Sequence, residues 1–134
     1  MISLMQDDRL TALRAKIPAF ADAIHISLLE GGLTNKNYRV DTASGSYVMR
    51  ISNKADSMLG INRENERVNT GKAHQAGIGP EVIDSLPDEN VLVIRWIEAK
   101  TLHAADFQSN PILLPAIANA LLALHHTFIC RIRV

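Results

Sequence analysis

The sequence LEGGLTNKNYRVDTASGSYVMRI, residues 29–51, decides the predicted fold. Runs that alternate apolar and polar residues lie on both sides of a Gly-Gly pair, and a third run follows a Ser44-Gly45 turn. Alternation with a period of two is typical of half-buried strands, and glycine pairs permit the backbone angles of tight turns. The stretch therefore predicts three strands, over residues 26–29, 37–40 and 47–51.

The same stretch has the residue types of a loop that covers nucleotide phosphates. Gly31 and Gly32 let the backbone approach a ligand closely, and Thr34 and Asn35 place short polar groups beside it. Arg50, near the end of the third run, would bring a cation to the phosphates from one side. The competing interpretation is an ordinary hairpin turn with a solvated strand arginine.

The third run predicts which way Arg50 points. Tyr47, Met49 and Ile51 share one face of the strand, while Val48 and Arg50 share the other. In the first run the apolar residues leave only Ser27 as an obvious outward position.

Helices are predicted on both sides of the three strands. Residues 7–17 form an amphipathic helix with a packing role, and residues 61–76 form an unusually polar helix that Gly77 ends. Glu64 and Glu66 lie in the first turns of the polar helix. Each glutamate either belongs to a solvated face near the positive end of the helix dipole or holds Arg50 in position.

Two further strands, over residues 81–84 and 91–96, follow the polar helix. The first three strands have no helical crossovers, so we expect an α+β fold with a five-stranded antiparallel sheet and one inserted helix. Beyond Trp96, residues 103–110 are polar and residues 112–126 form an apolar helix. The last residues, 127–134, are compatible with a strand.

Composition excludes several classes of function. The 134 residues suffice for one domain. The 14 basic residues are balanced by 14 acidic ones and aromatic residues make up only 4%, and both facts argue against a nucleic-acid binder. Cys130 is the single cysteine, so we expect no internal disulfide and a reducing, cytoplasmic setting. We also expect no membrane partner, because the apolar segment 111–124 is too short to span a bilayer. The five histidines show no metal-ligand spacing.

Six segments, in order and with similar spacing, carry a family resemblance. They are GGLTNKNYRV (31–40), YVMRI (47–51), NRENE (62–66), GIGPEVI (77–83), VLVIRWIEAKTL (91–102) and LLALH (121–125). On these the chain resembles the N-terminal part of the choline/ethanolamine kinase and aminoglycoside phosphotransferase families, small-molecule kinases with a protein-kinase-like fold. The resemblance implies a nucleotide-binding lobe over residues 1–97, with the hinge and the start of an incomplete C-terminal lobe over residues 98–134.

The resemblance also implies an ATP site. Its residues would be a phosphate loop of Gly31, Gly32, Leu33, Thr34 and Asn35, the cation Arg50 with its partner Glu66, and a hinge of Trp96, Ile97 and Glu98. Glu66 is preferred to Glu64 because it lies fourteen residues before Pro80, as the paired glutamate does in the family. An arginine stays charged and offers phosphate two donors at once.

The catalytic residues of these kinases have no counterpart in the chain. The family carries an H-x-D-x-x-x-x-N motif, followed by a magnesium-binding aspartate, and no such motif is present. We therefore assign no catalytic residue and no metal ligand, although Mg²⁺ is expected for the full-length family. We expect a truncated lobe that is inactive alone.

Three interpretations of function stay open at this point. The first is a kinase for a small hydroxyl compound, with choline or ethanolamine ahead of an aminoglycoside as acceptor. The second is a non-catalytic module that binds nucleotide or forms homo-oligomers through the apolar helix at residues 112–124. The third is an α+β domain without a nucleotide site.

Overall fold

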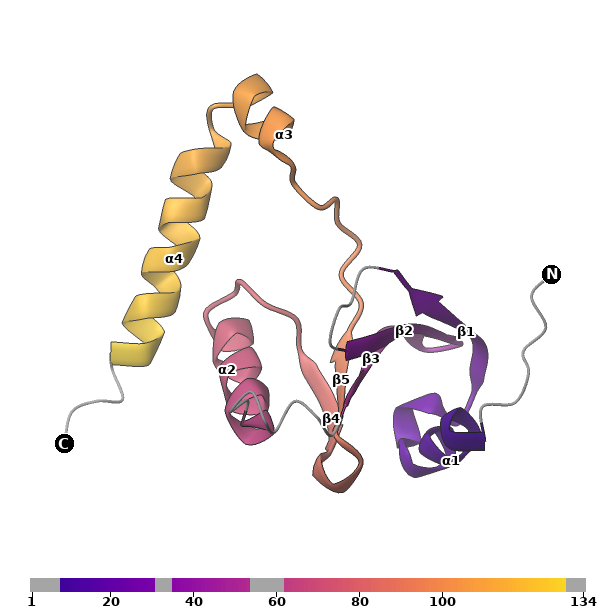
Figure 1. The fold of residues 1–134 in the computed structure, drawn as a ribbon. Helices are drawn as coiled ribbons and strands as arrows, with labels where there is room; N and C mark the ends of the chain where they lie inside the picture. The colour runs from indigo at the N-terminus through magenta and orange to yellow at the C-terminus, as the bar shows by residue number, and fades with distance from the viewer. Residues whose placement is uncertain (1–7, 31–34, 54–61, 130–134) are drawn as a thin grey trace. The chain divides into compact units, whose positions relative to one another are not determined.

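The computed structural model describes residues 8–30, 35–53 and 62–129 (Figure 1). Its elements are α1 (Asp8–Lys16), η1 (Pro18–Phe20), β1 (Ala23–Leu29), β2 (Asn35–Thr42), β3 (Gly45–Ser52), α2 (Arg63–Gln75), β4 (Val82–Leu86), η3 (Pro87–Glu89), β5 (Val91–Arg95), α3 (Ala104–Ser109) and α4 (Leu113–Ile129). They form two compact units. The sheet unit comprises Met1–Ile61 and Ile83–Trp96, and the helical unit comprises Asn62–Val82 and Ile97–Val134.

The sheet unit contains five strands in the order β1-β2-β3-β5-β4. The pairs β1–β2, β2–β3 and β3–β5 are antiparallel, which confirms the predicted α+β sheet. Tyr38 is opposite Met49, and Met49 is opposite Val93, so these three side chains share one face. All three are buried, and they define the core face of the sheet.

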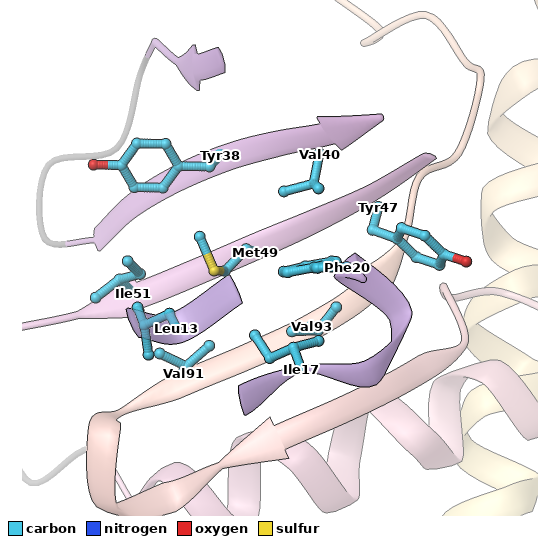
Figure 2. Packing of buried hydrophobic residues seen from close by; sticks show 10 residues of the cluster. All are labelled: Leu13, Ile17, Phe20, Tyr38, Val40, Tyr47, Met49, Ile51, Val91 and Val93. Atoms are coloured by element: carbon cyan, nitrogen blue, oxygen red, sulfur yellow. The ribbon is translucent and has the colours of Figure 1, made fainter. Parts of the chain in front are cut away.

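The N-terminal helical segment covers this core face. Leu13 of α1, Ile17 and Phe20 of η1 are almost completely buried and belong to one cluster with residues of β2, β3 and β5. Figure 2 shows their side chains gathered between the helical segment and the strands. The three- and four-residue spacing of Leu10, Leu13 and Ile17 places them on one side of the helix. The predicted packing role of this helix is confirmed.

The β2–β3 hairpin is closed by a local hydrogen-bond network. The Thr42 hydroxyl accepts from the Ser44 N–H at 3.2 Å and donates to the Gly45 carbonyl at 2.8 Å. Gly45 has a φ of +149°, a value that residues with a Cβ rarely adopt. The hairpin sets the register of β2 against β3, and therefore the face on which each side chain lies.

Strand β1 departs from its predicted burial. Ser27 was expected to be the outward position, but Ile24 is 75% exposed and Leu28 is 59% exposed, whereas Ser27 is partly buried. The reason is topological, because β1 lies at the edge of the sheet and pairs with β2 alone.

The helical unit begins with a capped helix. The Asn62 side chain accepts hydrogen bonds from the backbone N–H groups of Glu64 (3.0 Å) and Asn65 (3.2 Å), which satisfies two donors at the start of α2. None of its residues is buried, in agreement with its predicted polar character. It ends before Gly77, which has a φ of +76° and thus a left-handed backbone conformation.

The C-terminal part of the described chain differs from the prediction in two places. Residues 104–109 form the helix α3, where a polar connector was expected. Helix α4 continues to Ile129, so a strand over residues 127–134 is wrong for its first three residues.

Helix α4 contacts α2 within the helical unit. Five large apolar side chains are exposed along α4 and at the residue directly before it. They are Ile112, Leu114, Ile117, Leu121 and Leu122. Among the described helices, none combines the length and the apolar character needed to cross a bilayer.

Candidate nucleotide site

The predicted site residues fall into three groups. Gly31, Gly32, Leu33 and Thr34 lie outside the described residues. Asn35, Arg50 and Trp96 belong to the sheet unit, and Glu66, Ile97 and Glu98 belong to the helical unit. The structure places Asn35, Arg50 and Trp96 on one sheet, and the predicted pairing of Arg50 with Glu66 stays a prediction.

Arg50 lies on the sheet face opposite the core. It pairs with Asn37 of β2 and with Leu92 of β5, and its neighbours on β3, Met49 and Ile51, are buried on the core face. The Arg50 Nε donates a hydrogen bond to the Asn37 side-chain oxygen at 3.2 Å. The predicted face is confirmed, and the contact with Asn37 orients a guanidinium that carries five N–H donors in all.

Asn35 is the last residue of the predicted phosphate loop and the first residue of β2. Its Oδ1 is buried and, among the described residues, has no hydrogen-bond partner. A buried acceptor without a partner lowers stability by about 1–3 kcal/mol.

A second polar cluster on the same sheet face was not found from the sequence. The Arg39 Nε donates to Asp41 Oδ1 at 2.9 Å, and the Ser46 hydroxyl donates to the same oxygen at 2.6 Å. The Arg39 guanidinium lies over the Trp96 ring, 4.4 Å from its centroid. The Ser46 hydroxyl, and after it Arg39, lower the pKa of Asp41 below its ordinary value.

The sequence contained part of the signal for this cluster. Asn37, Arg39 and Asp41 alternate with buried residues along β2, and a strand period of two places them on one face. The contact with Trp96 joins residues far apart in the sequence, and only the pairing of β3 with β5 brings them together.

The predicted hinge begins where β5 ends. The Trp96 N–H donates to the Ser46 carbonyl at 3.0 Å, so this group is engaged by the sheet and is not the donor for a base. Residues 96–103 have no regular secondary structure, and both Ile97 and Glu98 are exposed. Exposed backbone without secondary-structure hydrogen bonds is suited to recognising a base edge.

The two candidate glutamates of α2 have different surroundings. The Glu66 carboxylate accepts from Arg63 Nη1 at 2.7 Å, and its side chain is 20% exposed. The Glu64 side chain is 58% exposed and forms two hydrogen bonds with Arg67, which lower its pKa. Both carboxylates are thus paired within their own helix, and Glu66 is the less exposed of the two.

The remaining titratable residues do not form a metal site in the described part of the chain. No group of three or more histidine, cysteine, aspartate or glutamate side chains there could hold a metal ion. Asp106 accepts the His103 N–H at 2.7 Å and contacts Lys100, and these contacts lower its pKa, with Lys100 the larger cause. The His103–Asp106 pair therefore caps α3.

The five-stranded antiparallel sheet, with a cation on the face of its third strand opposite the core, agrees with the protein-kinase-like N-terminal lobe that the family resemblance implies. Two solved structures are similar to the chain. A choline/ethanolamine kinase family protein from Mesorhizobium loti matches 78% of the chain with 36% identity and a TM-score of 0.60. The choline kinase LicA from Streptococcus pneumoniae matches 77% with 23% identity and a TM-score of 0.65.

These matches cover 33% and 36% of the two solved chains, so the present chain spans about a third of their length. The model of the phosphotransferase enzyme family matches residues 25–128, and the chain therefore belongs to this family. No curated protein matched the chain.

Proposed function

We propose that this chain is the ATP-binding lobe of a small-molecule kinase of the choline/ethanolamine kinase type. The observation that carries the proposal is the position of Arg50 on β3, oriented by Asn37 on the polar face of the sheet, in a chain of the phosphotransferase family. A cation held in this way can neutralise nucleotide phosphates through charge-assisted hydrogen bonds.

The proposal assigns one part of the nucleotide to each group of residues. Gly31, Gly32, Leu33, Thr34 and Asn35 would surround the phosphates, Arg50 would bind them with Glu66 as its partner, and the backbone of residues 96–98 would bind the base. The nucleotide-binding lobe would comprise residues 1–97, and the hinge with the start of the C-terminal lobe would comprise residues 98–134. Mg²⁺ would arrive with ATP, because no ligand for it is assigned in this chain.

We infer that the chain binds ATP without transferring its phosphate. Phosphoryl transfer requires a group that receives the acceptor's proton and ligands that position the metal. The sequence contains no H-x-D-x-x-x-x-N motif, and the His103–Asp106 pair caps a helix. Activity would require residues that the chain does not supply.

The acceptor is proposed from similarity alone. The solved structure that is 36% identical is described as a choline/ethanolamine kinase family protein, which favours choline or ethanolamine over an aminoglycoside. A cytoplasmic location fits a kinase that uses ATP and contains a single cysteine.

A second candidate, a non-catalytic oligomerising module, is favoured by one observation. Helix α4 exposes Leu114, Leu121 and Leu122 by half or more, and self-association would bury them. Light scattering across a range of concentrations separates the candidates, because the module must form a defined oligomer in the absence of ATP.

Calorimetric titration with ATP, with and without Mg²⁺, tests the proposed function. Wild-type protein should bind ATP, and Arg50→Ala should weaken binding about 10- to 100-fold, since hydrogen bonds to charged groups contribute about 1.5–3 kcal/mol each. Arg67→Ala is the matched control, because Arg67 pairs with Glu64 on the exposed side of α2. The absence of binding at millimolar ATP would refute the proposal.

The pairing of Arg50 with Glu66 is tested by a double-mutant cycle. If the two residues act together on phosphate, Arg50→Ala combined with Glu66→Ala should weaken binding less than the sum of the single changes. Additive losses would show that Glu66 is not the partner.

A further inference from the structure

We propose that Arg39 is a positioning residue for the base of the nucleotide, acting through Trp96. The inference rests on the proposed function, because it concerns the end of the ATP site that Arg50 does not reach. It assigns Arg39 no contact with the phosphates. If Arg39 has this role, the affinity of the chain for purine nucleosides depends on the stacked arginine–tryptophan pair.

The side chain of Trp96 is held from one face. The Arg39 guanidinium lies 4.4 Å from the centroid of the ring, well within the range of a cation–π interaction. Arg39 is itself oriented by Asp41 through its Nε, at 2.9 Å. A planar guanidinium tied at one nitrogen can cover an aromatic face in a defined orientation, which an ammonium on a flexible stem cannot do.

The backbone of Trp96 is held by the same cluster. Its N–H donates to the Ser46 carbonyl at 3.0 Å, and the Ser46 hydroxyl donates to Asp41 at 2.6 Å. Asp41 therefore connects the residue that stacks on the indole with the residue that binds its backbone. The chain leaves β5 at this point, so the cluster sets the direction in which the predicted hinge begins.

The strand register separates this cluster from the phosphate end. Arg39 is opposite Val48, and Asn37 is opposite Arg50. Two residues along a strand correspond to about 7 Å, and Arg39 lies on the side away from Asn35 and the predicted phosphate loop. A change at Arg39 should therefore affect the recognition of the base, while the recognition of the phosphates by Arg50 stays intact.

The affinity gain would come from preorganisation. A side chain and a hinge backbone that are already ordered lose less conformational entropy when a base binds. Removing the stacked cation should leave the Trp96 side chain less ordered before binding, so that more conformational entropy is lost when a base binds. It should also make the indole ring more accessible to solvent.

The experiment compares Arg39→Met with Arg95→Met. Arg95 is the matched control, because it precedes Trp96 on β5 and lies over a different ring, that of Tyr47, at 5.6 Å. Binding of ATP, adenosine and tripolyphosphate is measured for each protein. Arg39→Met should weaken ATP and adenosine by the same factor, about two- to five-fold, which corresponds to a partly exposed cation–π contact. Tripolyphosphate should bind unchanged, and Arg95→Met should behave as wild type.

Fluorescence gives a second readout, because Trp96 is the single tryptophan of the chain. Acrylamide should quench its emission more strongly in Arg39→Met than in wild type or Arg95→Met. Arg39→Lys keeps the cation without the Nε contact to Asp41, so it should restore part of the adenosine affinity.

The outcomes distinguish the inference from the proposed function. If wild-type protein does not bind ATP, the proposed function fails and the inference fails with it. If wild type binds ATP and Arg39→Met binds adenosine equally well, the inference alone is overturned. Equal losses for adenosine and tripolyphosphate would also overturn it, because they would indicate a general structural effect.

Discussion

The sheet unit and the helical unit differ in how many of their apolar side chains are buried. In the sheet unit, ten buried side chains form one cluster between α1, η1 and the strands (Figure 2). In the helical unit, α2 has no buried residue and α4 exposes a series of leucines and isoleucines. The sheet unit can therefore hold Arg50, Asn35 and Trp96 through its own packing. The helical unit has capped helices α2 and α3 and a contact between α2 and α4.

The largest expected difference between the units is in the cost of removing an apolar side chain. Phe20 is completely buried, with its ring 5.9 Å from that of Tyr47, so Phe20→Ala should lower the free energy of unfolding by about 3–5 kcal/mol. Leu114 is 61% exposed, and Leu114→Ala should change it by less than about 0.5 kcal/mol. Urea denaturation followed by circular dichroism measures both. Similar losses would show that α4 is packed as tightly as the sheet core.

The next largest effect on stability comes from replacing two glycines of the helical unit by alanine. One replacement should destabilise the protein and the other should stabilise it. A Cβ on Gly79 would lie 2.8 Å from the Ala73 Cβ, so Gly79→Ala should destabilise by about 1–3 kcal/mol. A Cβ on Gly71, inside α2, would meet nothing within 4 Å, so Gly71→Ala should stabilise by about 0.5–1 kcal/mol. Thermal unfolding measures the sign directly. A stabilising Gly79→Ala would show that the segment after α2 does not pack closely on it.

The cap of α2 should have a smaller effect. Asn62→Ala removes the acceptor for two backbone N–H groups and should lower stability by about 1 kcal/mol. Asn65→Ala is the control, because it removes an exposed amide from within the helix. Hydrogen exchange should show faster exchange in the first turn of α2 for Asn62→Ala only. If both variants exchange alike, the cap contributes nothing.

The smallest effect is the pH dependence that Asp41 gives to the sheet unit. The Ser46 hydroxyl and Arg39 hold the pKa of Asp41 below its ordinary value of 3.8, so folding favours the ionised carboxylate. The resulting stabilisation is fully present above the unfolded pKa and is lost as the pH falls through the folded pKa. The melting-temperature difference between wild type and Asp41→Asn should therefore be constant from about pH 7 to pH 5 and shrink below about pH 4.

Local regularities of the sequence predicted much of the fold and the orientation of Arg50. Strands β2 and β3 alternate in burial as their sequences alternate in polarity, so the face of Arg50 followed directly. Helix α3 was missed because the carboxylate that caps it, Asp106, belongs to a short polar segment without apolar periodicity. Leu28 was assigned to the interior because strand composition does not reveal that β1 is an edge strand.

The sequence by itself determined the elements of the sheet, the Ser44-Gly45 turn and the cation on β3, because these depend on residues close together along the chain. The tertiary structure alone decided that Arg39 covers Trp96 and that the Trp96 N–H is bonded to Ser46. These contacts depend on which strands are neighbours, and strand order is set by burial of the whole core face. The stretch at residues 29–51 therefore predicts a cation for phosphates, whereas the Arg39–Trp96 contact, which we propose positions the base, depends on the assembled sheet.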